Sequence, residues 1–155
     1  MRSLDNALDT IVRTIWASIL GLDVQRCSDD APPSPRERSL TGWVEINGAW
    51  QGAVALSCST ELARQAAAII FESDPTSAST AQASDVIAEL VNITGGNLKG
   101  LMPEPCQLSI PEIIEPIECA ERFARGDVVA RVAFECLGEP LLVSCMERPA
   151  AGLRA

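Results

Sequence analysis

Three polar residues, Asp85, Glu89 and Asn92, lie at helical spacing in the segment SDVIAELVNITGGNLKG, residues 84–100. The chain contains no histidine, which excludes Ser-His-Asp and Cys-His nucleophile systems and any histidine general base. Any chemistry must therefore use carboxylates, amides, hydroxyls or lysine. Because the segment presents two carboxylates and an amide together, it is the candidate site of this sequence.

A helical wheel divides the segment into a polar face and an apolar face. At about 100° per residue, one narrow stripe holds Asp85, Glu89, Asn92 and Gly96. The opposite side, which must face the core, holds Ile87, Leu90, Val91, Thr94, Leu98 and Leu101. The polar stripe is therefore expected to point into solvent or into a partner.

The composition of the stripe argues against a merely solvated face. Asparagine costs roughly 0.5 kcal/mol in a helix interior relative to alanine, and glycine costs about 1 kcal/mol. Lys99 lies too far along the helix to pair with Glu89, whereas an exposed glycine lets another backbone or a bulky group come close. Spacing alone leaves two alternatives open: a solvated face, or a helix that ends at Gly95 and Gly96.

The cysteines do not predict a metal site. Six cysteines are present, and no two of them form a CxxC pair. Without histidine, the Cys/His zinc patterns are excluded. We interpret these residues as small buried apolar side chains in a reducing compartment, and we expect neither a metal nor a cofactor of the protein's own.

Charge and hydropathy limit the partners and the location. A net charge of −9 and a sequence pI near 4.4 argue against nucleic acid and anionic membranes as partners. No signal peptide is recognised, and no run of about 18 apolar residues could span a bilayer. The sequence therefore predicts a cytoplasmic protein.

The length and the 47% hydrophobic composition predict one domain with a substantial core. We place this domain at residues 1–148, with an internal loop at 30–39 and a frayed tail at 149–155. Residues 3–20 carry apolar side chains at three- and four-residue spacing, which predicts an amphipathic helix that ends at Gly21.

The next segments predict a hairpin and a second helix. Asn47-Gly48 divides residues 40–59 into two apolar runs, and this dipeptide is typical of a type I′ hairpin turn. Ser59 is expected to cap the helix TELARQAAAIIF that follows.

The long helix that carries the candidate site has a start signal of its own. Ser79 and Gln82 fit a capping box, which predicts a helix from about Thr80 to about Lys99. Three later runs, CQLSIPEII, DVVARVAFECL and EPLLVSCM, read as strands. The element order predicts an α+β (α/β two-layer) fold, in which helices pack on one face of a mostly antiparallel sheet.

The pattern Asp85-x3-Glu89-x2-Asn92, followed by ITGGNLKG, resembles the signature helix of the CheC/CheX/FliY family of chemotaxis phosphatases, and within it the CheX type. The first helix, the hairpin with the second helix, and LSIPEII are also similar to that family, so the resemblance covers nearly the whole chain. The proline that the family carries some twenty residues after the asparagine corresponds to either Pro111 or Pro116.

The resemblance implies a phosphatase that hydrolyses the aspartyl phosphate of a CheY-like receiver domain. By this analogy Asn92 orients the attacking water, and Glu89 reaches the active-site lysine of the receiver. Asp85 and Gly96 would face the partner. The receiver supplies Mg²⁺ and the phosphoryl group, and the resemblance also implies a homodimer.

Members of the family with two sites carry a second acidic-amide helix, but Asp9, Arg13 and Trp16 of the first helix do not match it, so one site is expected.

Three functions compete. The first is the phosphatase that the resemblance implies. The second reading is an adaptor that binds a receiver or a flagellar-switch protein without catalysis. The third is a structural dimerisation domain, in which the polar stripe would be incidental.

Overall fold

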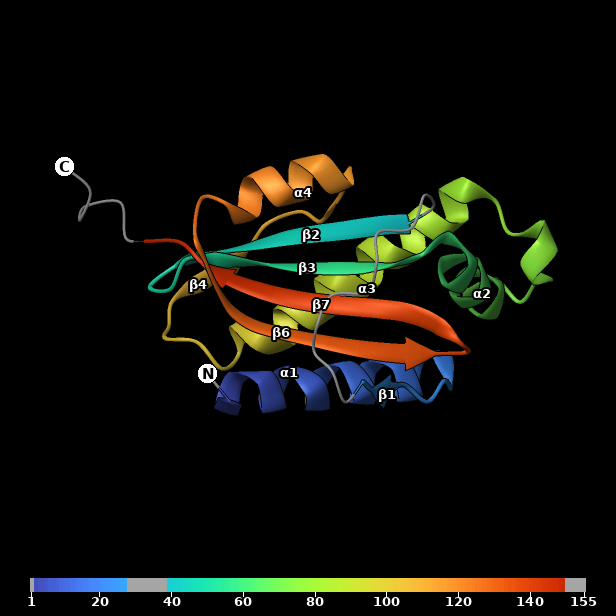
Figure 1. Cartoon of the computed structure of the whole chain (residues 1–155), viewed down its shortest axis with the longest axis horizontal. Helices are drawn as coiled ribbons and strands as arrows, with labels where there is room; N and C mark the ends of the chain where they lie inside the picture. The colour runs from blue at the N-terminus through green and yellow to red at the C-terminus, as the bar shows by residue number, and fades with distance from the viewer. Residues whose placement is uncertain (1, 28–38, 150–155) are drawn as a thin grey trace.

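Seven antiparallel strands form one open sheet within residues 2–27 and 39–149, the part of the chain that the computed structural model describes (Figure 1). The strand order is β1-β6-β7-β3-β2-β4, and β5 also pairs with β2. The elements are α1 (Arg2–Ile15), a π-helical turn (Trp16–Leu20), β1 (Gln25–Arg26), β2 (Ser39–Gly48), β3 (Gly52–Ser59), α2 (Thr60–Ile70), a 3-10 turn (Pro75–Ser77), α3 (Thr80–Lys99), β4 (Cys106–Leu108), β5 (Glu112–Ile114), α4 (Pro116–Phe123), β6 (Asp127–Cys136) and β7 (Glu139–Glu147). This is the α+β class that the sequence predicts.

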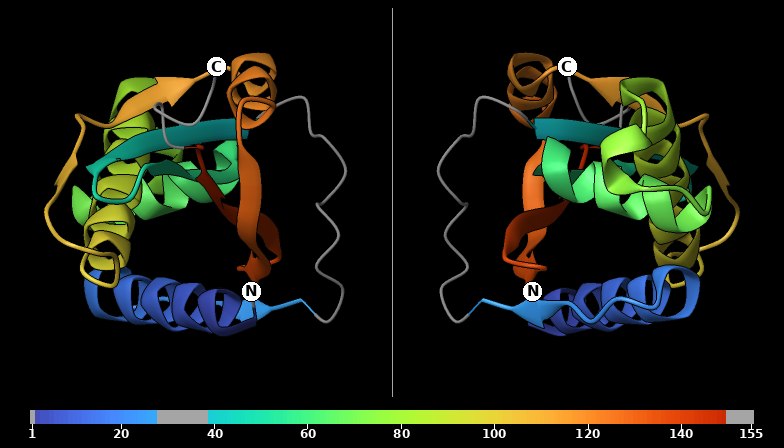
Figure 2. Two further views of the ribbon diagram at one scale, coloured as in Figure 1. Left: turned by 90° about the vertical axis from the view of Figure 1, so that its left-hand side faces the viewer. Right: turned by 90° about the vertical axis from the view of Figure 1, so that its right-hand side faces the viewer.

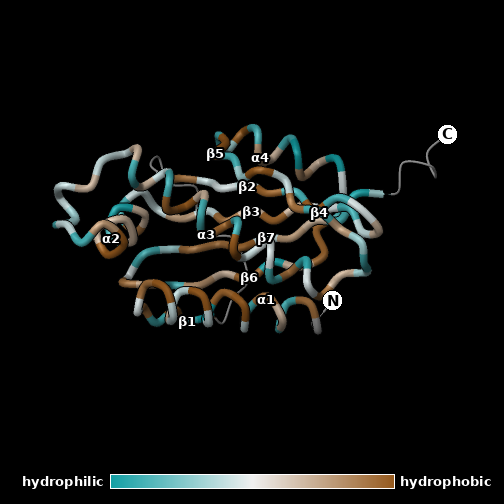
Figure 3. Tube along the Cα trace, turned by 180° about the vertical axis from the view of Figure 1, so that it is seen from behind, coloured by the Kyte–Doolittle hydropathy of each residue, from teal (hydrophilic) through white to brown (hydrophobic). Residues whose placement is uncertain are grey.

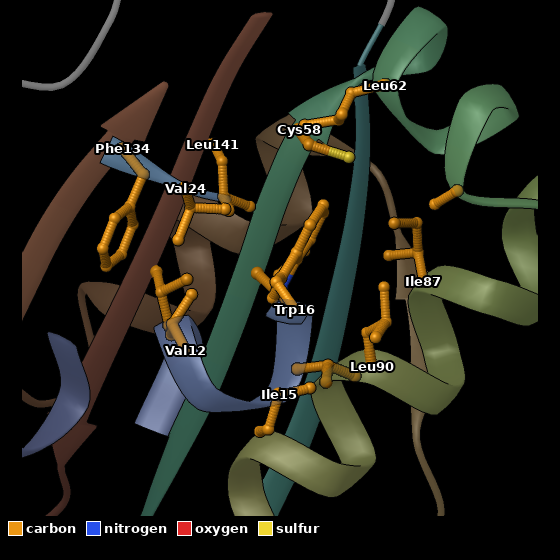
Figure 4. Packing of buried hydrophobic residues seen from close by; sticks show 14 of the residues in the cluster. Val12, Ile15, Trp16, Val24, Cys58, Leu62, Ile87, Leu90, Phe134 and Leu141 are labelled. Carbon is orange, nitrogen blue, oxygen red and sulfur yellow. The ribbon is translucent and has the colours of Figure 1, made fainter. Parts of the chain in front are cut away.

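The main core lies between one face of the sheet and the helices α1, α2 and α3. Alternate residues of the central strands point into it, among them Val44 of β2 and Val54 and Leu56 of β3. Figure 4 shows Trp16, the first residue of the π-helical turn after α1, pointing toward Cys58 of β3, and Ile87 and Leu90 of α3 pointing into the same core. The three helices that the sequence predicts thus cover one face.

A fourth helix, α4, was not predicted and lies against the opposite face of the sheet. Figure 2 shows α3 and α4 on different sides of β2. Phe123 of α4 packs on Trp43 with ring centroids 5.5 Å apart, and the Arg122 guanidinium lies 5.2 Å from the centre of the Trp43 ring. The expectation that helices pack on one face is therefore incomplete, because this two-turn helix covers part of the other face.

The amphipathic helix expected over residues 3–20 is confirmed, with a change of winding in its last turn. Hydrophobic positions recur along α1 at helical spacing (Figure 3). The chain then forms the π-helical turn and stops at Gly21, whose φ of 67° lies in the left-handed region that favours glycine. Trp16 in this turn is fully buried.

The predicted hairpin forms, but without a two-residue turn at Asn47-Gly48. The last β2–β3 pair is Ile46 with Gly52, so residues 47–51 connect the two strands. Within this connection Asn47 and Gly48 extend β2 and pair with β4. A Cβ atom on Gly48 would lie 2.2 Å from the Pro105 carbonyl oxygen. Glycine is required here because the chain that leads into β4 approaches closely, and not because of a type I′ turn.

Local signals for the helix starts are confirmed. The Ser59 hydroxyl accepts a hydrogen bond from the Leu62 backbone N–H, and Ser79 forms the expected capping box with Gln82. Helix α3 runs to Lys99. The alternative in which the glycine pair ends the helix is therefore wrong.

Two glycines bring α3 close to the sheet. A Cβ atom on Gly42 of β2 would lie 2.9 Å from Val91 Cγ1, and one on Gly95 of α3 would lie 2.5 Å from Val44 Cγ1. At both points the backbone of a glycine therefore packs directly against a valine side chain of the other element. This contact fixes the height of α3 above β2.

Two predicted segments fall mainly outside the described residues. Of the loop placed at 30–39, only Ser39 is described, and it begins β2. Of the tail placed at 149–155, only Pro149 is described.

All six cysteines are free, and Cys58, Cys136 and Cys145 are buried. The interpretation as buried apolar side chains thus holds for these three, while the others are half-buried.

We expect the free energy of unfolding to fall above about pH 9. Burial raises the pKa of both Cys58 and Cys145 from the ordinary 9.0 to about 12. Because the folded pKa exceeds the unfolded one, this stabilisation is complete below pH 9 and is lost as pH rises toward 12. Urea denaturation at pH 8, 9 and 10 measures how steeply the free energy of unfolding falls with pH. A Cys58→Ala/Cys145→Ala variant should show a shallower decline, and an equal slope would contradict the assignment.

Candidate functional site

The polar stripe of α3 faces away from the core, as the helical wheel predicts. Asp85 and Glu89 are exposed, and Asn92 and Gly96 are half-buried. On the opposite side the five residues expected inside are buried, namely Ile87, Leu90, Val91, Thr94 and Leu98. The sixth, Leu101, was placed there wrongly, since it lies beyond the end of α3 and is 60% exposed.

The Glu89 and Asn92 side chains form no hydrogen bond or ion pair with any residue that the structure describes. Asn97 of the same helix behaves differently, because its Nδ2 donates to the Ile93 carbonyl at 2.9 Å. Residues three apart on a helix have Cβ atoms about 5–6 Å from each other. An acid and an amide thus lie side by side on α3 with their hydrogen-bonding groups free.

Asp85 extends this polar face by one turn toward the start of the helix. It is exposed and, like Glu89, has no side-chain partner among the described residues. The three sequence-predicted polar residues therefore stay together on one rigid element. The capping box and the close contacts at Gly42 and Gly95 hold that element in place.

An apolar edge borders this face and was missed in the sequence. Leu108 of β4 lies 3.9 Å from where a Gly96 Cβ atom would be, and α3 also contacts β5. Two residues after Leu108, Ile110 is 84% exposed. The available signal was Pro111 in the segment SIPE, because proline cannot donate to a strand ladder and so indicates a break in the predicted strand. Ile110 thus lies in the segment that joins β4 to β5, and both of these strands contact α3, which makes it a candidate contact residue for a partner.

Helix α1 does not offer a second site of this kind. Asp9 forms ion pairs with Arg13 at 2.6 Å and with Arg26 at 3.6 Å, and Trp16 is buried. The Asp9 carboxylate is thus paired with two arginines, whereas the Glu89 carboxylate has no partner among the described residues.

The described residues contain no cluster of three or more His, Cys, Asp or Glu side chains that could hold a metal ion. Among the described helices, none combines the length and the apolar composition that crossing a bilayer requires.

The model of the family "Chemotaxis phosphatase CheX" matches residues 40–132 of this chain. Similar solved structures include CheX of Vibrio vulnificus, with 11% identity, a TM-score of 0.71 and coverage of 92% of this chain and 95% of that one. CheX of Desulfovibrio desulfuricans follows with 13% identity, a TM-score of 0.69, and 94% and 99% coverage.

A third similar structure is a CheX-CheY complex with BeF3 and Mg²⁺ from Borrelia burgdorferi. It shows 14% identity and a TM-score of 0.67, and the match covers 93% of this chain and 97% of that one. No curated protein matches this sequence. At these identities the solved structures establish the fold.

Proposed function

Because the chain belongs to the CheX family of chemotaxis phosphatases, whose model matches residues 40–132, we propose that it hydrolyses the aspartyl phosphate of a CheY-like receiver domain. One observation carries the proposal. Glu89 and Asn92 lie on an exposed face of a rigid helix, and their side chains have no partner among the described residues. Such a face is ready to enter the active site of another protein.

Asn92 is proposed to orient the attacking water in line with phosphorus. A neutral amide both donates and accepts hydrogen bonds, and it adds no negative charge beside a phosphoryl group. Phosphoryl transfer needs little covalent chemistry from the protein, mainly a positioned nucleophile and stabilised charge. The receiver is proposed to supply Mg²⁺, so the role of this chain is to position the reacting groups.

Glu89 is proposed to pair with the active-site lysine of the receiver, while Asp85 and Gly96 lie at the contact surface. A charge-assisted hydrogen bond of this kind would hold the helix in register over the phosphoryl group. The partner class is supported by the CheX of Borrelia burgdorferi, which is found in complex with CheY. The proposed assembly is a homodimer, which light scattering of the purified protein would test.

A second candidate function is an adaptor that binds a receiver without hydrolysis. The exposed Ile110, in the segment between β4 and β5, favours it, because an apolar contact supports binding and plays no part in catalysis. The two functions differ in what happens to the phosphoryl group after binding.

The deciding experiment measures the lifetime of phosphoaspartate on a receiver from the same organism. The receiver is charged with a small phosphodonor and Mg²⁺ and is incubated with substoichiometric amounts of the wild type or of Glu89→Ala. Multiple turnovers by the wild type, and slower turnover by the variant, support the phosphatase. A receiver that binds but keeps its phosphate at the uncatalysed rate supports the adaptor.

Replacement of Ile110 by serine is expected to weaken receiver binding without slowing the chemical step. Truncation of an apolar contact residue costs about 1–2 kcal/mol, which corresponds to roughly a 5- to 30-fold rise in KM. The kcat should stay within about twofold, because Ile110 has no proposed role in positioning the water. Steady-state dephosphorylation over a range of receiver concentrations separates the two parameters, with the exposed Ile117→Ser on α4 as the control. A fall in kcat at unchanged KM would contradict this role.

A further inference from the structure

A groove of about 440 Å³ lies on the other face of the sheet, between the strands and α4. Its floor is made by β2, β3, β7 and β6, and α4 forms one wall. The site on α3 lies across the sheet from it (Figure 2). The groove is therefore separate from the surface proposed to meet a receiver.

Hydroxyl groups and one arginine form a polar floor. The Thr41 Oγ1 and Ser57 Oγ atoms lie 2.8 Å apart on neighbouring strands. On the adjacent strand pair, Arg131 Nε donates to Ser144 Oγ at 3.3 Å. Thr41 and Ser144 are each only 3% exposed, so they belong to a formed surface.

Arg131 keeps most of its hydrogen-bonding capacity. Among the described residues its guanidinium has no carboxylate partner, and its two Nη atoms form no hydrogen bond, while its backbone N–H donates to Asp5 Oδ1 at 3.2 Å. By contrast, Arg122 pairs with two glutamates and Arg148 pairs with one. Within residues 2–27 and 39–149, the groove lining contains neither aspartate nor glutamate, although the whole chain has 21 acidic residues. The local charge is therefore positive within an acidic protein, which favours an anion.

The rest of the groove lining is largely apolar. Phe123 and Ala120 of α4 and Leu142 of β7 line it. Cys119 also lines it, and burial raises the pKa of its thiol above the ordinary 9.0, so this side chain is uncharged at neutral pH. A ligand that fits must therefore combine an anionic end with an apolar body.

We propose that this groove binds a small organic monocarboxylate. The carboxylate accepts hydrogen bonds from the free Nη atoms of Arg131, whose planar fork matches its geometry. The hydrogen-bonded hydroxyl pair of Ser57 and Thr41 lies beside it and keeps one O–H as a further donor, and the apolar body lies against Phe123 and Leu142. The volume is within the range of about 300–1,000 Å³ that small-molecule sites occupy.

Nuclear magnetic resonance titration of the full chain tests the proposal, with phenylacetate and hexanoate as probes. We expect saturable shifts of the Arg131 Nε–H signal and of the Leu142 and Ser144 amides. Phenylacetamide has the same apolar body without the charge, and it should bind at least about tenfold more weakly, since a charged hydrogen bond contributes about 1.5–3 kcal/mol. The assignment to a carboxylate would be overturned if phenylacetamide bound as tightly as phenylacetate. It would also be overturned if inorganic phosphate, added by itself, produced the same shifts.

Two variants locate the site. Arg131→Gln removes the charge, and Ala120→Trp fills the mouth of the groove from α4, so each should weaken phenylacetate binding at least tenfold. Arg125→Gln, on an exposed arginine that does not line the groove, should bind as the wild type does. Amide spectra confirm that each variant is folded. Unchanged binding in a folded Arg131→Gln protein, or a change of oligomeric state in Ala120→Trp in place of lost binding, would contradict the proposal.

Discussion

Replacement of Asn92 by alanine is expected to slow receiver dephosphorylation by about 100-fold or more, since removal of one positioned catalytic group costs this much in other enzymes. The amide is the group proposed to hold the attacking water, and alanine neither donates nor accepts a hydrogen bond. Asn92 is half-buried and has no partner among the described residues, so its loss should leave the fold intact. The measurement is the rate of phosphoaspartate loss, with receiver affinity determined separately.

Asn97 provides the matched control, because it is an exposed asparagine on the same helix. Its side chain is bonded to the Ile93 carbonyl at 2.9 Å, so Asn97→Ala should dephosphorylate the receiver at the wild-type rate. Receiver affinity should stay within about threefold for both variants, which is less than 1 kcal/mol.

The same pair of variants separates the competing functions. An adaptor would show no turnover with wild type or variants, and Asn92→Ala would at most alter its affinity. In a structural dimerisation domain, Asn92→Ala would change neither turnover nor affinity. Loss of turnover with retained affinity, in Asn92→Ala but not in Asn97→Ala, fits the phosphatase alone.

The sequence predicts α3 well because all its signals are local. The Ser79 and Gln82 capping box marks the start, and the apolar period fixes which face is buried. The outward direction of Glu89 and Asn92 follows from that period. The freedom of their side chains from other partners does not follow, because it depends on which residues the fold brings nearby.

The sequence-based errors arise where distant parts of the chain meet. Asn47-Gly48 has the composition of a hairpin turn, yet β4 pairs with both residues, and the approach of Pro105 explains the glycine. Helix α4 has only eight residues and follows an apolar run, so it lacks the length at which helical periodicity stands out. Its place on the far side of the sheet depends on Trp43, about 80 positions earlier in the chain.

The two adjacent glycines of α3, Gly95 and Gly96, are expected to serve different purposes, the first in packing and the second in partner contact. At Gly95 a methyl group would lie 2.5 Å from Val44 Cγ1. Val44 is fully buried, and its branched side chain cannot turn aside easily. Overpacking of this kind costs about 1–3 kcal/mol, which exceeds the gain of up to about 1 kcal/mol from helix propensity. Urea denaturation of Gly95→Ala should therefore show a clear loss of stability.

Gly96→Ala, one position along the same helix, is expected to behave in the opposite way. Its methyl group would meet only Leu108 at 3.9 Å, which is ordinary contact, so the variant should gain up to about 1 kcal/mol in stability. If Gly96 faces the receiver as proposed, the same methyl group should raise KM for the phosphorylated receiver. A variant with higher stability and a higher KM would show that α3 gives up helix stability so that its partner can approach. If the variant is more stable but keeps the wild-type KM, Gly96 does not belong to the contact surface, because nothing else in the described structure opposes an alanine there.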